Sequence, residues 1–350
     1  MSVKALSVVP GKPDTAGVRD HPDPSPSEGA LLVEGVLMGV CGTDIEIIQE
    51  GYGWAPPGEE RLIIGHESLG RVVDAPAGSG FAKGDLVAGI VRRPDPVPCA
   101  PCANGQWDFC RNGQYTERGI KERNGYGATQ WRVEPEFAVK LDAGLGDAGV
   151  LMEPTSVVAK AWEQSEKIAE RTPAPQRVAL ITGAGPIGLL AALIGVQRGY
   201  EVHVLDRVES GPKPQLVRDV GAVFHAGEVS EIGVQPDLVI ECTGYGPLVF
   251  DLVGVVAKDA VICLAGISAS NRKFAVGLDS INKEMVLENT VLFGSVNAAR
   301  RHYEQAGEAL AKADLDWLNR LVSRKVPLSD YTDALERHDD DVKVAIDLRH

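Results

Sequence analysis

The chain has 350 residues, 44% of them hydrophobic, which is enough for about two domains with separate cores. Its formal net charge is −14. Nucleic acids and anionic membranes select basic surfaces, so this charge excludes them as the main partner and favours an enzyme that acts on a small molecule.

The N-terminus and the cysteines indicate the cellular compartment. Residues 1–4 begin the chain without a basic segment and a long apolar stretch behind it, so we expect no secretory signal. The longest apolar region, residues 187–196, is short and interrupted by glycine, which predicts a buried helix rather than a membrane span. We therefore expect a cytoplasmic protein. Three of the six cysteines cluster, which in a reducing compartment indicates metal ligation rather than disulfides.

The first part of the chain, residues 3–139, is typical of short strands punctuated by glycine and proline, for example at 31–40 and 70–73. Between 156 and 171 the apolar residues take helical spacing, and the proline-rich residues 172–175 then break the pattern. This predicts a connecting helix followed by a domain boundary.

Beyond Gln176, strands alternate with helices, which predicts a parallel doubly wound sheet. A helix passes through Leu189 and Val196. Near the C-terminus we expect helical stretches at Leu315 and Tyr331 and a strand at 342–348 that could return to the first domain. The strands expected in the sheet are 178–182, 202–206, 237–241, 260–265 and 291–296.

A glycine motif, Gly183-Ala184-Gly185-Pro186-Ile187-Gly188, closes the first of these strands and opens the helix. In this context it predicts a dinucleotide site, with the helix N-terminus facing the phosphates. Gly183 permits the tight turn, Gly185 lets the backbone approach the pyrophosphate, and Gly188 lets the helix pack close to the strand.

Asp206 ends the second strand and is placed to accept hydrogen bonds from the adenosine ribose hydroxyls. Its charge would repel a 2′-phosphate, which favours NAD over NADP. Arg207, with Lys213 nearby, could pair with such a phosphate if Asp206 turned away, so NADP stays open.

Three segments carry potential metal ligands, namely residues 41–44, 65–67 and 153–154. Cys41, His66 and a carboxylate could hold three tetrahedral positions of a zinc ion and leave the fourth open for substrate. Alone, Cys41 would be read as a small buried hydrophobe and His66 as a hydrogen-bonded histidine. Their joint occurrence beside a dinucleotide motif favours a catalytic zinc.

With these motifs the chain resembles the zinc-dependent medium-chain alcohol dehydrogenases over essentially its whole length, and within them the microbial glucose 1-dehydrogenase branch. The segments 41–44 and 65–67 and the Gly183 loop carry the general resemblance. The branch is indicated by Glu153-Pro154, by residues 117–120, and by Asn297 with His302.

The resemblance implies an α/β architecture and an assembly. Residues 1–173, completed by 297–350, would form a GroES-like β-rich catalytic domain, and residues 174–296 a Rossmann domain. It also implies a homo-oligomer, either a dimer or a tetramer.

The resemblance also implies roles for individual residues around the zinc. Cys41, His66 and Glu153 would ligate it, and Glu67 would do so directly or through water. Asp44 would accept the second imidazole N–H, or else only cap its turn. Together with Asp44 and Glu67, Thr43 forms the expected catalytic group, because its hydroxyl would bond the reacting oxygen and start the proton path. Glu46 stands where some relatives continue that path with a histidine.

The remaining implied contacts concern substrate and coenzyme. The expected substrate-binding residues are Thr43, Glu117, Glu153, Asn297 and His302. The expected coenzyme-binding residues are Gly183, Gly185, Pro186, Ile187, Gly188, Asp206, Arg207, Thr243 and Asn297.

Cys99-x2-Cys102-x7-Cys110 resembles the structural-zinc lobe of the same family, in which four cysteines are usual. Pro96 occupies the place of the first cysteine and has no ligand atom in its side chain. Asp95 beside it could supply an oxygen, or the lobe has lost its metal, so the fourth ligand stays open.

Together these features predict zinc-dependent oxidation of an aldose, β-D-glucose foremost, at C1 to the lactone, with hydride transfer to the nicotinamide. A polyol or other secondary-alcohol dehydrogenase is the alternative within the family. A catalytically silent, cofactor-binding interaction protein is the alternative from another class.

Overall fold

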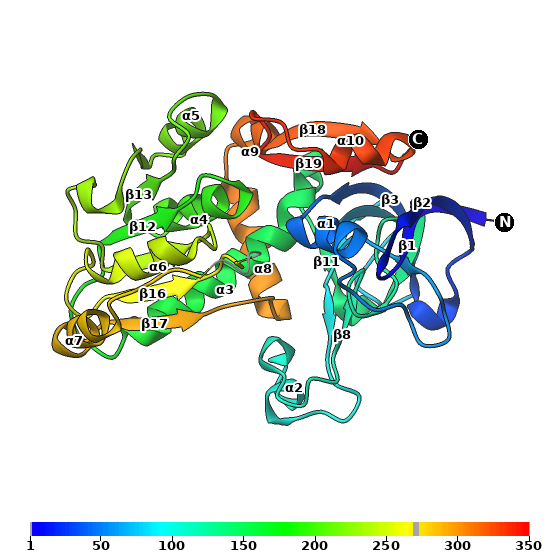
Figure 1. The fold of residues 1–350 in the computed structure, drawn as a ribbon. Coiled ribbons are helices and arrows are strands. Elements are labelled where there is room, and N and C mark those ends of the chain that lie inside the picture. The colour runs from blue at the N-terminus through cyan, green and yellow to red at the C-terminus, as the bar shows by residue number, and fades with distance from the viewer. Residues whose placement is uncertain (1, 269–272, 350) are drawn as a thin grey trace. The chain divides into compact units, whose positions relative to one another are not determined.

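A computed structural model describes residues 2–268 and 273–349, and their contacts divide the chain into two units (Figure 1). Unit 1 comprises Met1–Ser156 and Asn297–His350, and unit 2 comprises Val157–Val296. The sequence prediction placed the first boundary at 173/174, after the connecting helix. In the structure the division lies inside that helix, α3 (Met152–Ala169), because Met152 in its first turn still packs within unit 1, beside Gly307.

Unit 1 is built on strands, as the glycine-punctuated sequence predicts. Its largest sheet has the order β11-β6-β5-β3-β19-β18, with β10 added on β3, and the unit also contains two three-stranded sheets, β2-β1-β4 and β7-β8-β9. The strands are β1 (Ser2–Val9), β2 (Lys12–Pro22), β3 (Leu31–Gly39), β4 (Leu62–Ile63), β5 (Glu67–Asp74), β6 (Leu86–Gly89), β7 (Arg92–Arg93), β8 (Thr116–Arg118), β9 (Glu122–Arg123), β10 (Gln130–Val133), β11 (Ala138–Lys140), β18 (Val322–Pro327) and β19 (Lys343–Asp347).

The C-terminal strand returns to the sheet of unit 1, as expected for residues 342–348. β19 pairs antiparallel with β3, with Ala345 opposite Gly39 and Ile346 opposite Met38. Ile346 is buried in a core cluster with Met38 and Ile64. This pairing joins the last residues of the chain to the strand that leads into Cys41.

The helices of unit 1 lie between its strands in the chain and range from 4 to 13 residues in length. Ala100–Ala103 forms α2, which lies in a lobe that extends away from the strands of this unit (Figure 1). The helices are α1 (Gly42–Gln49), α2, α8 (Arg300–Lys312), α9 (Leu315–Leu321) and α10 (Tyr331–Leu335), with 3-10 turns η1 (Pro26–Glu28), η2 (Trp107–Phe109), η3 (Pro135–Phe137), η4 (Ala143–Leu151) and η6 (Leu328–Asp330).

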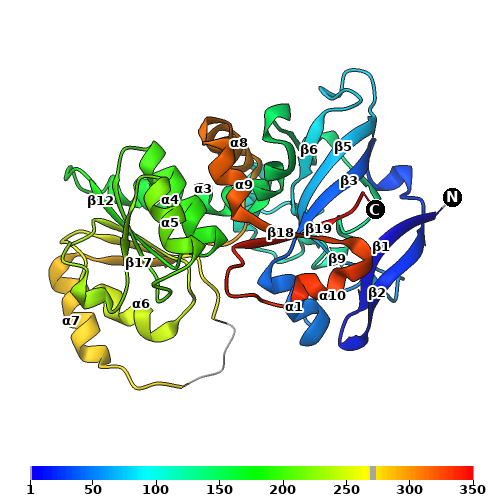
Figure 2. The same cartoon turned by 90° about the horizontal axis from the view of Figure 1, so that it is seen from above.

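Unit 2 holds the predicted parallel sheet, in the order β14-β13-β12-β15-β16-β17. Figure 2 shows α4 and α5 on one face of it and α6 and α7 on the other. Besides the part of α3 from Val157 onward, the elements of unit 2 are β12 (Val178–Thr182), α4 (Pro186–Gln197), β13 (Glu201–Leu205), α5 (Pro212–Asp219), β14 (Val223–His225), η5 (Val229–Glu231), β15 (Leu238–Glu241), α6 (Gly246–Val253), β16 (Val261–Leu264), α7 (Leu278–Glu288) and β17 (Val291–Gly294).

Burial explains why this sheet could be predicted from the sequence. Helices cover both faces of a doubly wound sheet, so its central strands are near-continuous apolar runs. In β12 the residues from Ala179 to Thr182 are all buried, and α4 is buried from Gly188 to Gly195. Within the described residues, no helix is both long and apolar enough to cross a membrane.

Candidate active site

Three of the predicted ligands come together in unit 1. One potential ligand atom each from Cys41, His66 and Glu67 lies within 4.8 Å of the other two. Cys41 precedes α1, His66 follows Gly65, whose φ of +96° turns the chain, and Glu67 opens β5. His66 and Glu67 are buried.

Asp44 makes the capping contact considered for it and also lies beside the His66 ring. Its Oδ2 accepts the backbone N–H of Cys41 at 2.9 Å and so caps the start of α1. Its Oδ1 lies 3.5 Å from His66 Nδ1, and both side chains are buried. Burial alone would lower the pKa of His66, but Asp44 and Cys41 raise it well above its usual value. A carboxylate that faces Nδ1 favours the tautomer in which Nε2 carries the lone pair.

Glu67 has a partner that the sequence analysis did not identify. The ammonium group of Lys343 donates to Glu67 Oε1 at 2.7 Å and to Oε2 at 2.6 Å, and both side chains are almost fully buried. The same ammonium donates to the Val40 carbonyl at 3.1 Å. A lysine between Val342 and Val344, at the start of β19, was the available signal, because a buried lysine requires an anionic partner.

Glu153 lies near Cys41, His66 and Glu67, but it is not among the residues whose ligand atoms lie within 4.8 Å of one another. Burial raises its pKa to about 7, His66 and Lys343 act to lower it, and Glu67 and Asp44 act to raise it. The structure therefore places Glu153 within electrostatic range of the predicted ligands. A buried carboxyl group of this kind holds a negative charge only beside a cation.

The donor set fits a zinc ion. Sulfur, imidazole nitrogen and carboxylate oxygen are the ligands that catalytic zinc takes from proteins, and their mutual distances here suit one ion. Glu67, whose two oxygens both accept hydrogen bonds from Lys343, is the carboxylate that lies among these ligand atoms, and Glu153 is a second carboxylate within electrostatic range of them.

The predicted sugar-binding residues Glu117 and Asn297 are in contact. Asn297 Nδ2 donates to Glu117 Oε1 at 2.7 Å. Asn297 takes a left-handed backbone conformation, with φ of 60°, and its Oδ1 accepts the backbone N–H of Ala298 at 2.8 Å. Glu117 is buried and ion-paired with Arg92, which the sequence analysis also did not identify.

The other two predicted sugar-site residues take definite positions within unit 1. His302 lies fully buried in the first turn of α8, where its Nδ1 accepts the backbone N–H of Ala299 at 3.0 Å, so a neutral ring carries its proton on Nε2. Thr43 is half-buried in the first turn of α1, two residues after Cys41.

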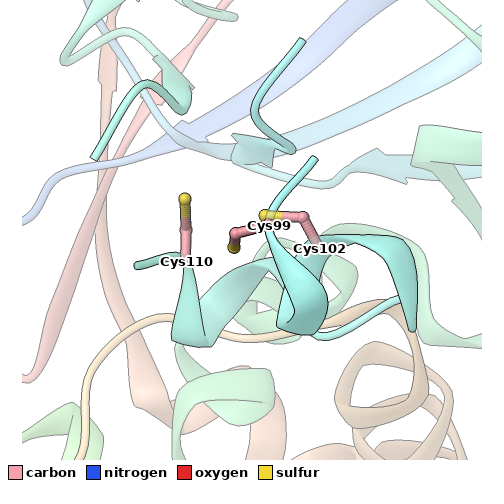
Figure 3. Close-up of side chains that lie close together, drawn as sticks. All are labelled: Cys99, Cys102 and Cys110. Atoms are coloured by element: carbon pink, nitrogen blue, oxygen red, sulfur yellow. The ribbon is translucent and has the colours of Figure 1, made fainter. Parts of the chain in front are cut away.

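The cysteine lobe brings its three thiols together, as Figure 3 shows. The Sγ atoms of Cys99, Cys102 and Cys110 lie within 4.8 Å of one another. The backbone N–H of Arg111 donates to Cys99 Sγ at 3.4 Å and contributes to lowering the pKa of Cys99 to about 7, whereas burial raises that of Cys102 to about 11. Asp95 is buried and its Oδ1 accepts the Val97 N–H, and its carboxylate oxygens are not among the ligand atoms that lie within 4.8 Å of one another.

In unit 2 the glycine motif has the geometry of a dinucleotide loop. Gly183 has φ of +87°, and a Cβ on Gly188 would lie 1.7 Å from the Gly183 carbonyl oxygen, so only glycine fits there. A Cβ on Gly185 would meet no atom within 4 Å, which leaves space for a ligand against this backbone. Pro186 and Ile187 form the first turn of α4, whose N-terminus is suited to phosphate.

Asp206 is held by the loops around it. Its Oδ2 accepts the Ala184 N–H at 2.5 Å and its Oδ1 accepts the Val208 N–H at 2.9 Å. Arg207 is exposed beside it, and Lys213 lies half-buried in the first turn of α5.

Thr243, another predicted coenzyme residue, is held by a buried carboxylate. Glu241 ends β15, and its Oε1 accepts the Thr243 N–H at 2.6 Å and also the Thr243 hydroxyl. The Thr182 hydroxyl, at the end of the neighbouring β12, donates to the same oxygen at 3.2 Å. Glu241 thus fixes the loop at the carboxyl ends of the central strands, where ligands bind in sheets of this kind.

Two family profiles match the chain. The profile described as the glucose dehydrogenase C-terminus matches residues 146–348, and that of the alcohol dehydrogenase GroES-like domain matches residues 27–143. Among relatives, the glucose 1-dehydrogenases of Methanocella arvoryzae and Thermoproteus tenax are 37% and 36% identical, each over 99% of this chain and over 99% and 100% of their own.

A solved structure agrees with these matches. The glucose dehydrogenase of Haloferax mediterranei in complex with NADP, Zn and gluconolactone superposes with a TM-score of 0.89 at 32% identity, over 98% of this chain and 99% of that one. The fold is therefore a GroES-like domain with a Rossmann-like parallel sheet. The chain belongs to the glucose dehydrogenase family of zinc-dependent medium-chain alcohol dehydrogenases.

Proposed function

We propose that the protein oxidises an aldose, β-D-glucose foremost, at C1 to the lactone, with transfer of the hydride to NAD or NADP. The observation that carries the aldose assignment is Glu117, a buried carboxylate whose Oε1 is bound by Arg92 and Asn297. A sugar requires directional acceptors for its hydroxyls, and a site built around them rejects simple alcohols that leave those groups unpaired.

Cys41, His66 and a carboxylate from Glu153 or Glu67 would hold the catalytic zinc. When bound there, zinc supplies Lewis acidity that polarises the C1 oxygen and lowers the pKa of its hydroxyl. Asp44 holds the imidazole tautomer. Thr43 takes the proton from the reacting hydroxyl through its own hydroxyl group and releases it along α1, where burial raises the pKa of Glu46 on the next turn.

NAD is the proposed preferred coenzyme, and NADP is accepted. The support is Asp206, whose carboxylate stands at the end of β13, where the adenosine ribose of a bound dinucleotide would lie. Exposed Arg207 beside it offers a partner for a 2′-phosphate.

The cysteine lobe would hold a second, structural zinc through Cys99, Cys102 and Cys110. The proximity of the three sulfurs supports this, and the backbone hydrogen bond from Arg111 that lowers the pKa of Cys99 favours metal ligation. Zinc content per chain, measured for the parent and for Cys110→Ser, tests it: the parent should hold two zinc ions and the variant one. The same zinc content in both proteins would contradict it.

We also propose a homo-oligomer, a dimer or tetramer, in a reducing cytoplasm. β17 stands at the edge of its sheet, and Val286 and Leu287 on neighbouring α7 are 67% and 62% exposed, which suits burial against a second copy. The six free cysteines suit a reducing compartment. Light scattering of the purified protein distinguishes a monomer from these assemblies.

The experiment that tests the function compares kcat/KM for glucose, sorbitol and ethanol in the parent and in Glu117→Gln. The variant keeps the size of the side chain and removes its charge, so glucose should lose roughly 2 kcal/mol in kcat/KM while ethanol changes little. Better turnover of ethanol or sorbitol by the parent would replace the aldose assignment with another alcohol. Coenzyme binding without turnover of any alcohol would indicate the silent interaction protein.

A further inference from the structure

Arg92 forms a buried ion pair with Glu117. Strands β7 and β8 pair antiparallel with Arg92 opposite Glu117, so the backbone register itself brings the two side chains together. Arg92 Nε and Nη2 donate to Glu117 Oε1 at 3.1 and 3.0 Å. Both side chains are more than nine-tenths buried.

Arg92 is itself held in place from two further directions. Its Nη1 donates to the Asp108 carbonyl at 3.3 Å, in the turn η2 between Cys102 and Cys110. Its guanidinium carbon lies 3.8 Å from the centre of the Tyr115 ring, a cation–π arrangement. Because these contacts hold the planar guanidinium from three sides, its N–H groups face Glu117 in a single orientation.

This arrangement divides the two oxygens of Glu117 between different tasks. Oε1 accepts both N–H groups of Arg92 and the amide of Asn297. Oε2 accepts no hydrogen bond from the described residues, which leaves it as the acceptor for a ligand hydroxyl. Without Arg92 the carboxylate could rotate about its last torsion, and Asn297 alone would have to hold it.

We propose that Arg92 is a positioning residue for aldose recognition: it holds Glu117 Oε1 so that Oε2 is presented to the hydroxyl next to the reacting carbon. This inference rests on the proposed function. In this role Arg92 acts through Glu117 rather than on the sugar itself, so its loss should raise KM for the sugar rather than slow hydride transfer.

Arg93 provides a matched control. It is the next residue of the same strand and is buried, and it is ion-paired through Nη2 with Glu134 at 2.8 Å and placed over the Phe137 ring at 4.2 Å. It has the same kinds of contacts as Arg92 and none with Glu117 among the described residues.

The test compares Arg92→Lys with Arg93→Lys, which both keep the charge and lose the planar fork. For Arg92→Lys we expect KM for glucose to rise about tenfold, with kcat nearly unchanged. For Arg93→Lys we expect less than about a threefold change in either constant. Equal effects of the two variants, or a loss in kcat alone, would overturn the proposal.

A double-mutant cycle shows whether Arg92 acts through Glu117. Arg92→Met should reduce kcat/KM for glucose about a hundredfold in the parent, but less than about threefold in the Glu117→Gln background. Arg92→Met should also reduce kcat/KM only slightly when 2-deoxyglucose is the substrate, because this sugar lacks the hydroxyl beside C1. Additive losses, or the same loss with both sugars, would show a general structural role instead.

Two kinds of failure remain distinct in these measurements. A parent enzyme that oxidises no aldose would refute the proposed function and this inference with it. A parent that oxidises glucose, combined with an Arg92→Lys variant that keeps the parental KM, would refute the role of Arg92 alone.

Discussion

Lys343 and Glu67 form a buried ion pair beside the predicted zinc ligands, with the ammonium group 2.7 and 2.6 Å from the two carboxylate oxygens. Burial alone would lower the pKa of Lys343, but Glu67 and Cys41 raise it above its usual value. The pair joins β19, at the end of the chain, to β5, and it keeps the carboxylate next to His66 neutralised.

Lys343→Met should destabilise the protein strongly, because it leaves the Glu67 carboxylate buried without its counter-charge. Removing one partner of such a pair costs about 3–5 kcal/mol in the free energy of unfolding. The loss should be smaller in zinc-loaded protein than after chelation, since a bound cation replaces the missing charge. Urea unfolding in both states measures this.

Lys140→Met is the control for this prediction. Lys140 pairs with Asp85 at 2.7 Å, but its side chain is 52% exposed. Its substitution should therefore lower the free energy of unfolding several times less than the substitution of Lys343 does. Equal losses for the two lysines would contradict the importance assigned to the buried pair.

Chelation should abolish turnover, and added zinc should restore it, because the protein ligands leave one side of the metal open and exchangeable. Cys41→Ala and His66→Ala should each abolish turnover, while coenzyme binding, followed by nicotinamide fluorescence, stays nearly unchanged since the dinucleotide loop lies in unit 2. Full activity in a demonstrably metal-free sample would refute the zinc mechanism.

The elements that the sequence predicts correctly are those with strong burial patterns. β12 and α4 form continuous apolar segments, and the glycine motif between them has one compatible geometry. The predicted strands did not include β14, a short edge strand, and of the helices between the strands of this sheet only α4 was predicted by its residues. α7, one of the others, buries none of its residues. An element that buries little leaves no apolar periodicity to read.

For the site, resemblance to a family identified Cys41, His66 and Glu67, which the structure brings together. It did not identify Lys343, because a single sequence holds no record of which residue, 276 positions away, neutralises Glu67. Arg92 was missed for a related reason: two-residue and three-residue strands, β7 and β8, have too few positions to predict a register.

Gly185→Ala and Gly188→Ala should separate coenzyme binding from folding. A Cβ at 185 has free space and a backbone φ of −79° that alanine accepts, so this variant should keep its melting temperature and bind NAD(P)H more weakly. A Cβ at 188 would lie 1.7 Å from the Gly183 carbonyl oxygen, so this variant should lose stability as well. Parental coenzyme affinity in Gly185→Ala would show that the pyrophosphate does not approach there.

The last prediction concerns coenzyme choice. Asp206→Ala should improve kcat/KM for NADP relative to NAD tenfold or more, a change of ~1.4 kcal/mol, because it removes a negative charge facing the 2′-phosphate. The variant also deprives the Ala184 N–H of its acceptor, so both coenzymes will bind less well and the ratio of the two constants is the quantity to measure.

Two further variants separate charge from loop geometry in this prediction. Asp206→Asn keeps one oxygen acceptor for a backbone N–H and removes the charge, so it should shift the ratio in the same direction. Arg207→Ala, added to Asp206→Ala, should cancel the gain, because exposed Arg207 is the expected partner of the phosphate. A shift in Asp206→Ala without one in Asp206→Asn would assign the effect to the distorted loop. A parent that already prefers NADP strongly would contradict the role given to Asp206.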